Sequence, residues 1–331
     1  MIEFRIGTDN AGQRLDKFLR KALPQVPVSH LFKMIRTKKV RVNGKRAQPE
    51  QPLQEGDALT IRGDERSLLG ALPGERRPAP PVDPKKLKIL YEDDWLMAVD
   101  KPSGMAVHTG SGITSGTLVD YVRAYLGPRA ERNGFTASPA HRLDRETSGV
   151  ILVAKRRPAM VHFTEVFTHG HPAKRYLALV KGRMPRDEGV VDLPLAEHQQ
   201  TAESKARRGV NMQEAVTRYR VVRQSGDAAL LDCLIETGRT HQIRRHLAAI
   251  GHPVAGDRKY GDFAFNREVR TRWGLKRLFL HARRIDFPHP EHQRKMSVEA
   301  ALPSELADVL NELQVWAERW TTQPAGQPAG V

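Results

Sequence analysis

The chain has 331 residues, of which 39% are hydrophobic and 28% charged, and it carries a formal net charge of +16. This length allows two domains, or one large domain with a smaller one attached. So large an excess of positive charge is typical of proteins that bind a polyanion, most often a nucleic acid. Cys233 is the single cysteine, which excludes an intrachain disulfide and a cysteine-based zinc site.

Hydropathy argues against a membrane protein. The chain contains no run of about 18 apolar residues, and residues 1–5 lack the apolar core of a secretory signal. We therefore expect a cytoplasmic protein with no membrane partner, and we expect a monomer. The 13 histidines show no His-Glu-x-x-His pattern, so we also expect no bound metal.

Positive charge is most concentrated in residues 1–62, where 13 Lys and Arg stand against 6 Asp and Glu. Apolar residues at helical spacing predict one helix over residues 15–22 and a second in which Leu31, Met34 and Ile35 face inward. Two short helices with a basic second helix indicate a small module that binds RNA. The alternative is an ordinary solvated helix face.

A hairpin follows these helices. The pair Asn43-Gly44 separates residues 40–42 from 45–47, which is a strong signal for a two-residue turn, and 58–61 reads as a further strand. This order of elements resembles an S4 RNA-binding domain. The resemblance implies that RNA is bound by five basic residues on or after the second helix: Lys33, Arg36, Lys38, Lys39 and Arg41.

Composition then divides the rest of the chain. Residues 63–84 are rich in proline and charge and predict a linker, whereas 85–316 form a second, larger domain. The low-complexity tail, residues 317–331, is expected to be disordered.

Short apolar runs in the second domain predict strands. They lie at residues 87–90, 95–99, 150–154, 176–180, 216–222, 229–235 and 278–280. Helical patterns lie between some of them, around residues 116–126, 158–168 and 240–250. Because strands and helices do not alternate strictly and no Gly-x-Gly-x-x-Gly motif occurs, a dinucleotide-binding fold is disfavoured. We expect an α+β fold with a mixed, largely antiparallel sheet.

Residues 141–151 read His-Arg-Leu-Asp-Arg-Glu-Thr-Ser-Gly-Val-Ile and place Asp144 between two arginines at the entrance to a buried strand. Opposite charges favour the ionised carboxylate, which is then suited to act as a nucleophile or base. The alternative is a surface loop with an Arg-Asp ion pair.

Four segments of this domain combine into one pattern. They are residues 100–108, 141–151, 174–180 and 237–247, the last reading Thr-Gly-Arg-Thr-His-Gln-Ile-Arg-Arg-His-Leu. In this order they resemble the RluA-type family of RNA pseudouridine synthases, and the resemblance covers about residues 10 to 316. It implies isomerisation of uridine to pseudouridine in large-subunit ribosomal RNA, with transfer RNA as the alternative substrate. No cofactor is expected, because the reaction adds and removes nothing.

The resemblance also assigns roles to residues. Asp144 is the catalytic carboxylate, which bonds to C1′, adds to the uracil ring or removes the 2′ proton of the ribose. Five residues support it. Arg142 helps to occupy the space left by the displaced base or holds the RNA backbone near it, and Tyr176 stacks on the uracil. Arg244 holds Asp144, Arg239 belongs to that network or binds a phosphate, and Leu280 lines an apolar wall. Strand packing is the alternative for Tyr176, and general phosphate binding for both Arg239 and Arg244.

Two other classes of function fit the same sequence. An inactive large domain would leave an RNA-binding assembly factor. An N-glycosylase would also extrude a base and use a carboxylate, but would release free uracil.

Overall fold

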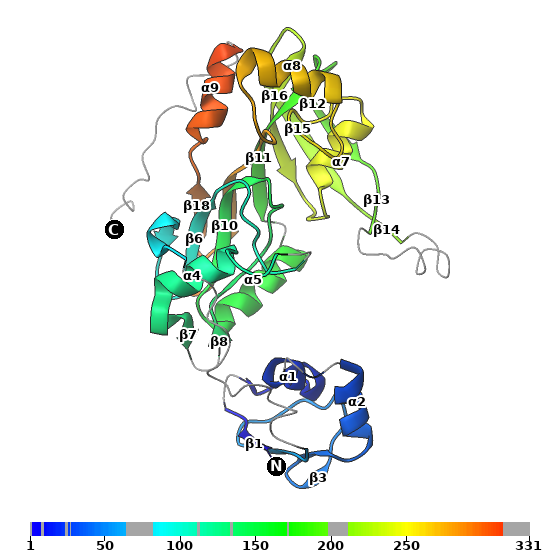
Figure 1. The fold of residues 1–331 in the computed structure, drawn as a ribbon, viewed down its shortest axis with the longest axis vertical. Coiled ribbons are helices and arrows are strands. Elements are labelled where there is room, and N and C mark those ends of the chain that lie inside the picture. Colours follow the sequence, from blue (N-terminus) through cyan, green and yellow to red (C-terminus); the bar gives the residue numbers. More distant parts are fainter. Residues whose placement is uncertain are drawn as a thin grey trace. The chain divides into compact units, whose positions relative to one another are not determined.

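The computed structural model describes residues 2–7, 10–23, 26, 28–63, 82–110, 113–132, 135–170, 172–197 and 211–313. The chain divides into two compact units, Met1–Val82 with Leu126–Ala137, and Asp83–Tyr125 with Ser138–Val331 (Figure 1). Most of the predicted linker, residues 64–81, and the whole predicted tail, 317–331, lie outside the described residues.

The first unit pairs two helices with a four-stranded antiparallel sheet of order β1-β4-β2-β3. Its elements are β1 (Ile2–Arg5), α1 (Leu15–Ala22), α2 (Val28–Arg36), β2 (Val40–Val42), β3 (Lys45–Arg46) and β4 (Ala58–Ile61), with a small hairpin of β7 (Glu131–Arg132) and β8 (Phe135–Thr136). The predicted inward residues Leu31, Met34 and Ile35 are buried. Asn43 and Gly44 both have positive φ, as a two-residue hairpin turn requires.

The second unit is built on a ten-stranded sheet. Its strands are β5 (Lys88–Glu92), β6 (Leu96–Lys101), β9 (Ser138–Pro139), β10 (Ser148–Ala154), β11 (Ala173–Lys181), β12 (Glu188–Asp192), β15 (Val216–Ser225), β16 (Ala228–Ile235), β17 (Leu280–Pro288) and β18 (Lys295–Glu299). Eight run in the order β12-β15-β16-β11-β17-β10-β6-β5, with β18 beside β17 and β9 beside β10. Among the described strand pairs only β10 and β17 are parallel. The predicted α+β fold with a mixed, largely antiparallel sheet is confirmed.

Helices and a further hairpin complete this unit. They are α4 (Leu118–Leu126), α5 (Arg157–His169), α7 (Gln242–Ala249), α8 (Phe263–Trp273), α9 (Ser304–Glu312), and the pair β13 (Leu195–Ala196) and β14 (Met212–Gln213), with a 3-10 turn at Pro84–Lys86. A second 3-10 turn, at Gly127–Ala130, belongs to the first unit. None of the helices in the described ranges has the length and apolar character needed to cross a bilayer.

The predicted helices correspond to α4, α5 and α7, but α8 and α9 were missed. Only Phe265 and Val269 of α8 are buried, and most of its other residues are polar, so the spacing of its buried apolar residues is too sparse to predict it. The edge strands β12 and β18 were missed for the same reason, because each buries a single residue.

Strand β10 is an interior strand of the sheet, between β17 and β6. All of its residues are buried, as expected for a strand covered on both faces, and α5 packs against it. Each buried Val, Ile or Leu side chain contributes roughly 1.5–3 kcal/mol. The loop that carries Asp144 leads directly into this strand and is therefore attached to the most deeply buried element of the unit.

Gly149 makes the parallel pairing of β10 with β17 possible. Its φ is +117°, and a Cβ built at this position would overlap the carbonyl oxygen of Ala282. The two backbones can approach this closely because residue 149 has no side chain.

We predict that Gly149→Ala lowers the free energy of unfolding by about 3 kcal/mol, since the methyl group meets backbone atoms that cannot move aside. Gly226→Ala is the control: Gly226 also has positive φ, but nothing lies within 4 Å of an added Cβ. The backbone strain there costs about 1–2 kcal/mol. Urea unfolding of both variants measures the difference, and equal losses would contradict the close approach.

Candidate active site

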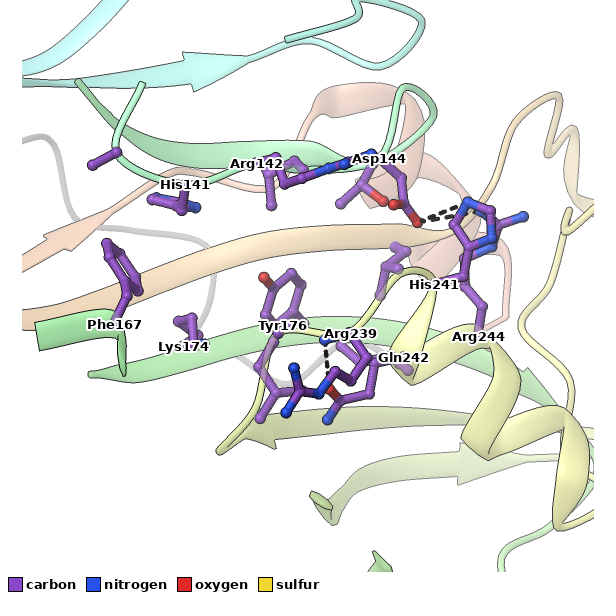
Figure 2. Close-up of a pocket in the computed structure, with 17 residues that line it drawn as sticks. His141, Arg142, Asp144, Phe167, Lys174, Tyr176, Arg239, His241, Gln242 and Arg244 are labelled. Atoms are coloured by element: carbon purple, nitrogen blue, oxygen red, sulfur yellow. Dashed lines mark hydrogen bonds and ion pairs between the residues drawn. The ribbon is translucent and has the colours of Figure 1, made fainter. Parts of the chain in front are cut away.

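A pocket of about 320 Å³ is formed by the loop before β10, by β11, by the start of α7 and by the start of β17 (Figure 2). Its lining residues are Ala140, His141, Arg142, Leu143, Asp144, Thr147, Phe167, Lys174, Tyr176, Ile235, Gly238, Arg239, His241, Gln242, Ile243, Arg244 and Leu280. All six residues that the sequence assigned to the active site are among them. The fold thus brings together side chains that are up to 138 positions apart in the sequence, from Arg142 to Leu280.

The turn after β6 holds the Asp144 loop in place. The amide of Gly104 donates to the carbonyl of Arg145 at 2.8 Å, and Nε of Arg145 donates back to the carbonyl of Gly104 at 2.9 Å. The hydroxyl of Ser103 donates to the carbonyl of Glu146 at 2.8 Å. These hydrogen bonds fix the backbone immediately after Asp144.

Lys101 completes this support from inside the protein. Its side chain is fully buried, and Nζ donates to the carbonyls of Pro102, Met105 and Arg145 at 2.9, 2.8 and 3.1 Å. All three ammonium donors are therefore satisfied. Burial lowers the pKa of Lys101 to about 7, and the positive charge of Arg277 acts in the same direction. Lys101 therefore has an architectural role in the turn after β6.

Arg244, on α7, links two carboxylates. Its Nε and Nη2 donate to Asp257 at 2.7 and 2.9 Å, and its Nη1 donates to Oδ2 of Asp144 at 3.2 Å. The guanidinium carbon also lies 5.2 Å from the centre of the Tyr260 ring. Because the bidentate pair with Asp257 fixes the orientation of the guanidinium, the remaining nitrogen is directed at Asp144.

The charges of the Arg244 and Asp257 pair reinforce each other. Burial by itself would raise the pKa of Asp257, but hydrogen bonds from Arg244 and from the amides of Tyr260 and Lys259 hold that pKa below its usual value. Burial by itself would lower the pKa of Arg244, and the bonds and charges of Asp257 and Asp144 raise it instead. The pair is therefore ionised at neutral pH.

The arginines beside Asp144 in the sequence do not make this contact. The guanidinium of Arg145 donates to the carbonyl of Gly104, and Arg142 is exposed on the pocket wall. The charges next to Asp144 in the sequence predicted a positive neighbour but not the right one. The guanidinium that bonds to Asp144 belongs to Arg244, 100 residues further on, which is the contact that the family resemblance implied.

Tyr176 lies on β11 and stands between the two ends of the pocket (Figure 2). Its side chain is buried, with 8% of the residue exposed. Burial raises the pKa of Tyr176, and the negative charge of Asp144 adds to the effect, so the phenol remains protonated. A rigid aromatic face is thus presented to the pocket beside the carboxylate.

Leu280 and Arg239 also line the pocket, around Tyr176 and Asp144. Leu280, 4% exposed, contributes apolar surface at the start of β17. Arg239 is exposed, and its Nε donates to the carbonyl of Glu214 at 3.0 Å. Among the described residues, no hydrogen bond or ion pair joins the side chain of Arg239 to Asp144 or Arg244.

Sequence reasoning missed His241 and Asp257. Nε2 of His241 lies 3.8 Å from Oδ2 of Asp144, and its Nδ1 lies 3.0 Å from the hydroxyl of Tyr260. His241 precedes Arg244 by three positions, but it is the N-cap residue of α7 with a positive φ and stands outside the helical repeat, so helical spacing did not point to it. No spacing pointed to Asp257 either, which reaches Arg244 across a loop.

His141 has a structural environment. Its Nε2 accepts a hydrogen bond from the amide of Leu152 at 3.0 Å, and burial lowers its pKa to about 3, with the charge of Lys174 contributing. It is therefore neutral at physiological pH. Within the described ranges no three His, Cys, Asp or Glu side chains form a group that could hold a metal ion.

The five residues assigned to RNA binding lie in the first unit. Lys33 and Arg36 are exposed on α2, Lys38 and Lys39 are exposed in the turn that follows, and Arg41 is half-buried on β2. A second pocket of about 420 Å³ is lined by Phe32, Lys33, Ile35, Arg36, Arg46, Ala47, Gln48 and Pro49. An exposed aromatic ring among cations is suited to binding single-stranded nucleic acid.

We predict that Asp257→Asn lowers the free energy of unfolding by about 3 kcal/mol, because it leaves the buried Arg244 without its anion. Glu268→Gln is the control, since it removes an exposed ion pair with Arg272 that contributes about 0.5 kcal/mol. Urea unfolding measures both, and equal effects would contradict the structural role of the buried pair.

The same variant carries a pH signature. Because the fold lowers the pKa of Asp257, its stabilisation is complete above pH about 4 and is lost as the pH falls through the lowered value. Asp257→Asn should therefore lose less stability than the wild type on acidification.

Comparisons with known proteins place the chain in a family. The RNA pseudouridylate synthase family matches residues 95–249, and the S4 domain matches residues 13–59. Ribosomal large subunit pseudouridine synthase C of Vibrio cholerae is 38% identical over 315 residues, which cover 93% of this chain and 96% of that protein. The protein of the same name from Escherichia coli is 40% identical over 314 residues, covering 93% of this chain and 95% of the relative.

Solved structures agree. Human RNA Pseudouridylate Synthase Domain Containing 4 superposes with a TM-score of 0.57 at 27% identity, over 69% of this chain and 93% of that chain. Human RNA Pseudouridylate Synthase Domain Containing 1 gives a TM-score of 0.54 at 26% identity, over 69% and 89%. With a synthase domain, an S4 domain and relatives that match nearly its full length, the chain belongs to the RluA-type family of RNA pseudouridine synthases.

Proposed function

We propose that this enzyme converts specific uridines of large-subunit ribosomal RNA to pseudouridine, with Asp144 as the catalytic carboxylate acting on a base turned out of its helix. The proposal for the substrate rests on the names of the relatives in Vibrio cholerae and Escherichia coli. The proposal for the chemistry rests on one observation, a carboxylate held by a buried arginine beside an aromatic face in a pocket. A ribosomal RNA substrate also agrees with the cytoplasmic location expected from the sequence.

The reaction exchanges one glycosidic bond for another. The C1′–N1 bond breaks, the base turns, and C1′ bonds to C5; the C5 proton is lost and N1 gains one. Asp144 promotes the first step by bonding to C1′, adding to the uracil ring or removing the 2′ proton. Arg244 fixes the position of the carboxylate for any of these, since its guanidinium is held by Asp257.

The pocket suits a reaction in which the cleaved base stays bound and is joined to the ribose again. Asp144 is the single carboxyl group among the lining residues. Most glycosidases use two carboxyl groups, one of which protonates the leaving group. Asp257 cannot be the second one, because its side chain is fully buried and bonded to Arg244. An isomerase, which recaptures its leaving group, fits this arrangement better than a hydrolase.

Extruding the uridine costs a few kcal/mol, which contacts in the pocket must offset. Stacking on Tyr176 supplies roughly 1–3 kcal/mol. Arg142, exposed beside Asp144, occupies the space that the base leaves, and Leu280 keeps water from the reacting carbon. Arg239 binds a phosphate at the pocket wall.

We predict that Asp144→Asn abolishes pseudouridine formation while ribosomal RNA is still bound, because the amide cannot act as a nucleophile or base. Carbodiimide derivatisation followed by primer extension detects the product, which has the same mass as uridine. Asp94→Asn, on an exposed side chain, is the control. Persistence of the modification in Asp144→Asn, or release of free uracil by the wild type, would overturn the proposal, and the second result would indicate a glycosylase.

The first unit is proposed to add affinity by neutralising phosphates of the RNA. We predict that Lys33→Glu with Arg36→Glu weakens ribosomal RNA binding and makes the dependence of log Kd on log salt shallower by about 0.7–0.9 for each phosphate that the variant no longer neutralises. Lys295→Glu, an exposed lysine on β18 of the second unit, is the control for net charge. If the loss of affinity and the change of slope in the double variant are only twice those of Lys295→Glu, net charge accounts for them and this surface makes no specific contribution.

A further inference from the structure

Lys174 is a buried cation at the opposite end of the pocket from Asp144. It lies on β11 two positions before Tyr176, so the two side chains leave the same face of the sheet. Figure 2 shows Asp144 and Arg244 at one end, Lys174 and Phe167 at the other, and Tyr176 between them. Only 8% of Lys174 is exposed, although it lines the pocket.

Lys174 has few partners of its own. Its Nζ lies 3.5 Å from the carbonyl oxygen of Thr237, at the limit of a hydrogen bond, and 5.7 Å from the centre of the Phe167 ring. No carboxylate in the described part of the chain lies within 4.0 Å of it. An ammonium group has three donors, and leaving them unused in a buried site is costly. The buried Lys101, by contrast, uses all three on carbonyls.

The charge of Lys174 is retained at neutral pH. Burial lowers its pKa to about 8, and the positive charge of Arg239 acts in the same direction. The pocket therefore contains a cation that needs an acceptor and is poised to lose its proton just above physiological pH.

We propose that Lys174 is a catalytic residue whose ammonium group stabilises the negative charge that develops on a carbonyl oxygen of the uracil during isomerisation. The inference rests on the proposed function and assigns a role that does not depend on how Asp144 acts. If the C1′–N1 bond breaks first, its electron pair leaves with the base and is shared by N1, O2 and O4. If Asp144 adds to the ring, the displaced pair moves to O4.

The symmetry of uracil explains why one cation is sufficient. A half-turn about the axis through N3 and C6 exchanges N1 with C5 and O2 with O4. A base that turns between bond cleavage and bond formation therefore presents first one carbonyl and then the other to the same point. C5 then gives a pair to C1′ and loses its proton, N1 gains a proton, and Lys174 keeps its own throughout.

A phosphate is the competing ligand for this ammonium. The exposed Arg239 is suited to a phosphate, whereas Lys174 is buried at the end of a pocket whose wall is the aromatic face of Tyr176. That position favours the edge of a stacked base.

The test compares Lys174→Met and Lys174→Arg with the wild type on an unmodified transcript of large-subunit ribosomal RNA. Lys181→Met is the matched control, because Lys181 lies on the same strand and pairs with Asp262 outside the pocket. We expect Lys174→Met to reduce the single-turnover rate about 100-fold with RNA affinity unchanged, as removal of one preorganised donor does. Lys174→Arg should recover part of that rate, and Lys181→Met should match the wild type.

The outcomes separate the two proposals. An unchanged rate in Lys174→Met overturns this inference and leaves the proposed function intact. Weaker binding and a shallower salt dependence at an unchanged rate also overturn it, because they identify a phosphate contact. If the wild-type enzyme forms no pseudouridine in the transcript, the proposed function is overturned, and this inference is overturned with it.

A pH profile provides a readout that does not depend on whether the methionine variant folds. The groups that interact electrostatically with Lys174 are Arg239 and His141, and its strand neighbours Ile235 and Ile285 do not titrate. We expect the wild-type rate to fall as the pH rises through about 8, where Lys174 loses its proton, and this part of the fall to be absent in Lys174→Arg. Any loss that follows deprotonation of Lys101 near pH 7 is common to both enzymes. Identical profiles for the two enzymes overturn the inference.

Discussion

The site depends on one guanidinium group shared by two carboxylates. Arg244 bonds to Asp257 through two nitrogens and to Asp144 through the third. The carboxylates differ in access, since the side chain of Asp257 is fully buried whereas 18% of that of Asp144 is exposed. Charges in a poorly solvated environment interact more strongly than they do in water. The inner carboxylate thereby orients the arginine, and the arginine positions the outer carboxylate while leaving one face of it open to the pocket.

The sheet holds these groups in position. The close approach of β10 and β17 at Gly149 brings the start of β17, with Leu280, to the end of the Asp144 loop. The buried Lys101 ties that loop to the turn after β6. A loop that joins a fully buried strand and is bonded on its other side to a neighbouring turn has little freedom to move. Such rigidity is what a reactive group requires when its partners come from distant parts of the chain.

Sequence patterns could predict the parts of this structure that repeat locally. The apolar run of β10 indicated a buried strand and so placed Asp144 on the loop before it. The spacing of α7 indicated a helix, which placed Arg244 on a regular element. No period connects Arg244 with Asp257, or Lys174 with the far end of the pocket, because those relations arise from strand order and loop path. The polar helix α8 escaped prediction because it buries only Phe265 and Val269.

Under the proposed function, the pocket must hold a base that turns over between two bonds. Hydrogen bonds to the ring edges from rigid, planar groups would fix one orientation and oppose the turn. An aromatic face such as that of Tyr176 stacks on a base in either orientation. A lysine presents a compact charge with rotatable donors, unlike the planar fork of an arginine. The rigid arginine therefore lies where a carboxylate must be held still, and the lysine lies where a base must be free to turn.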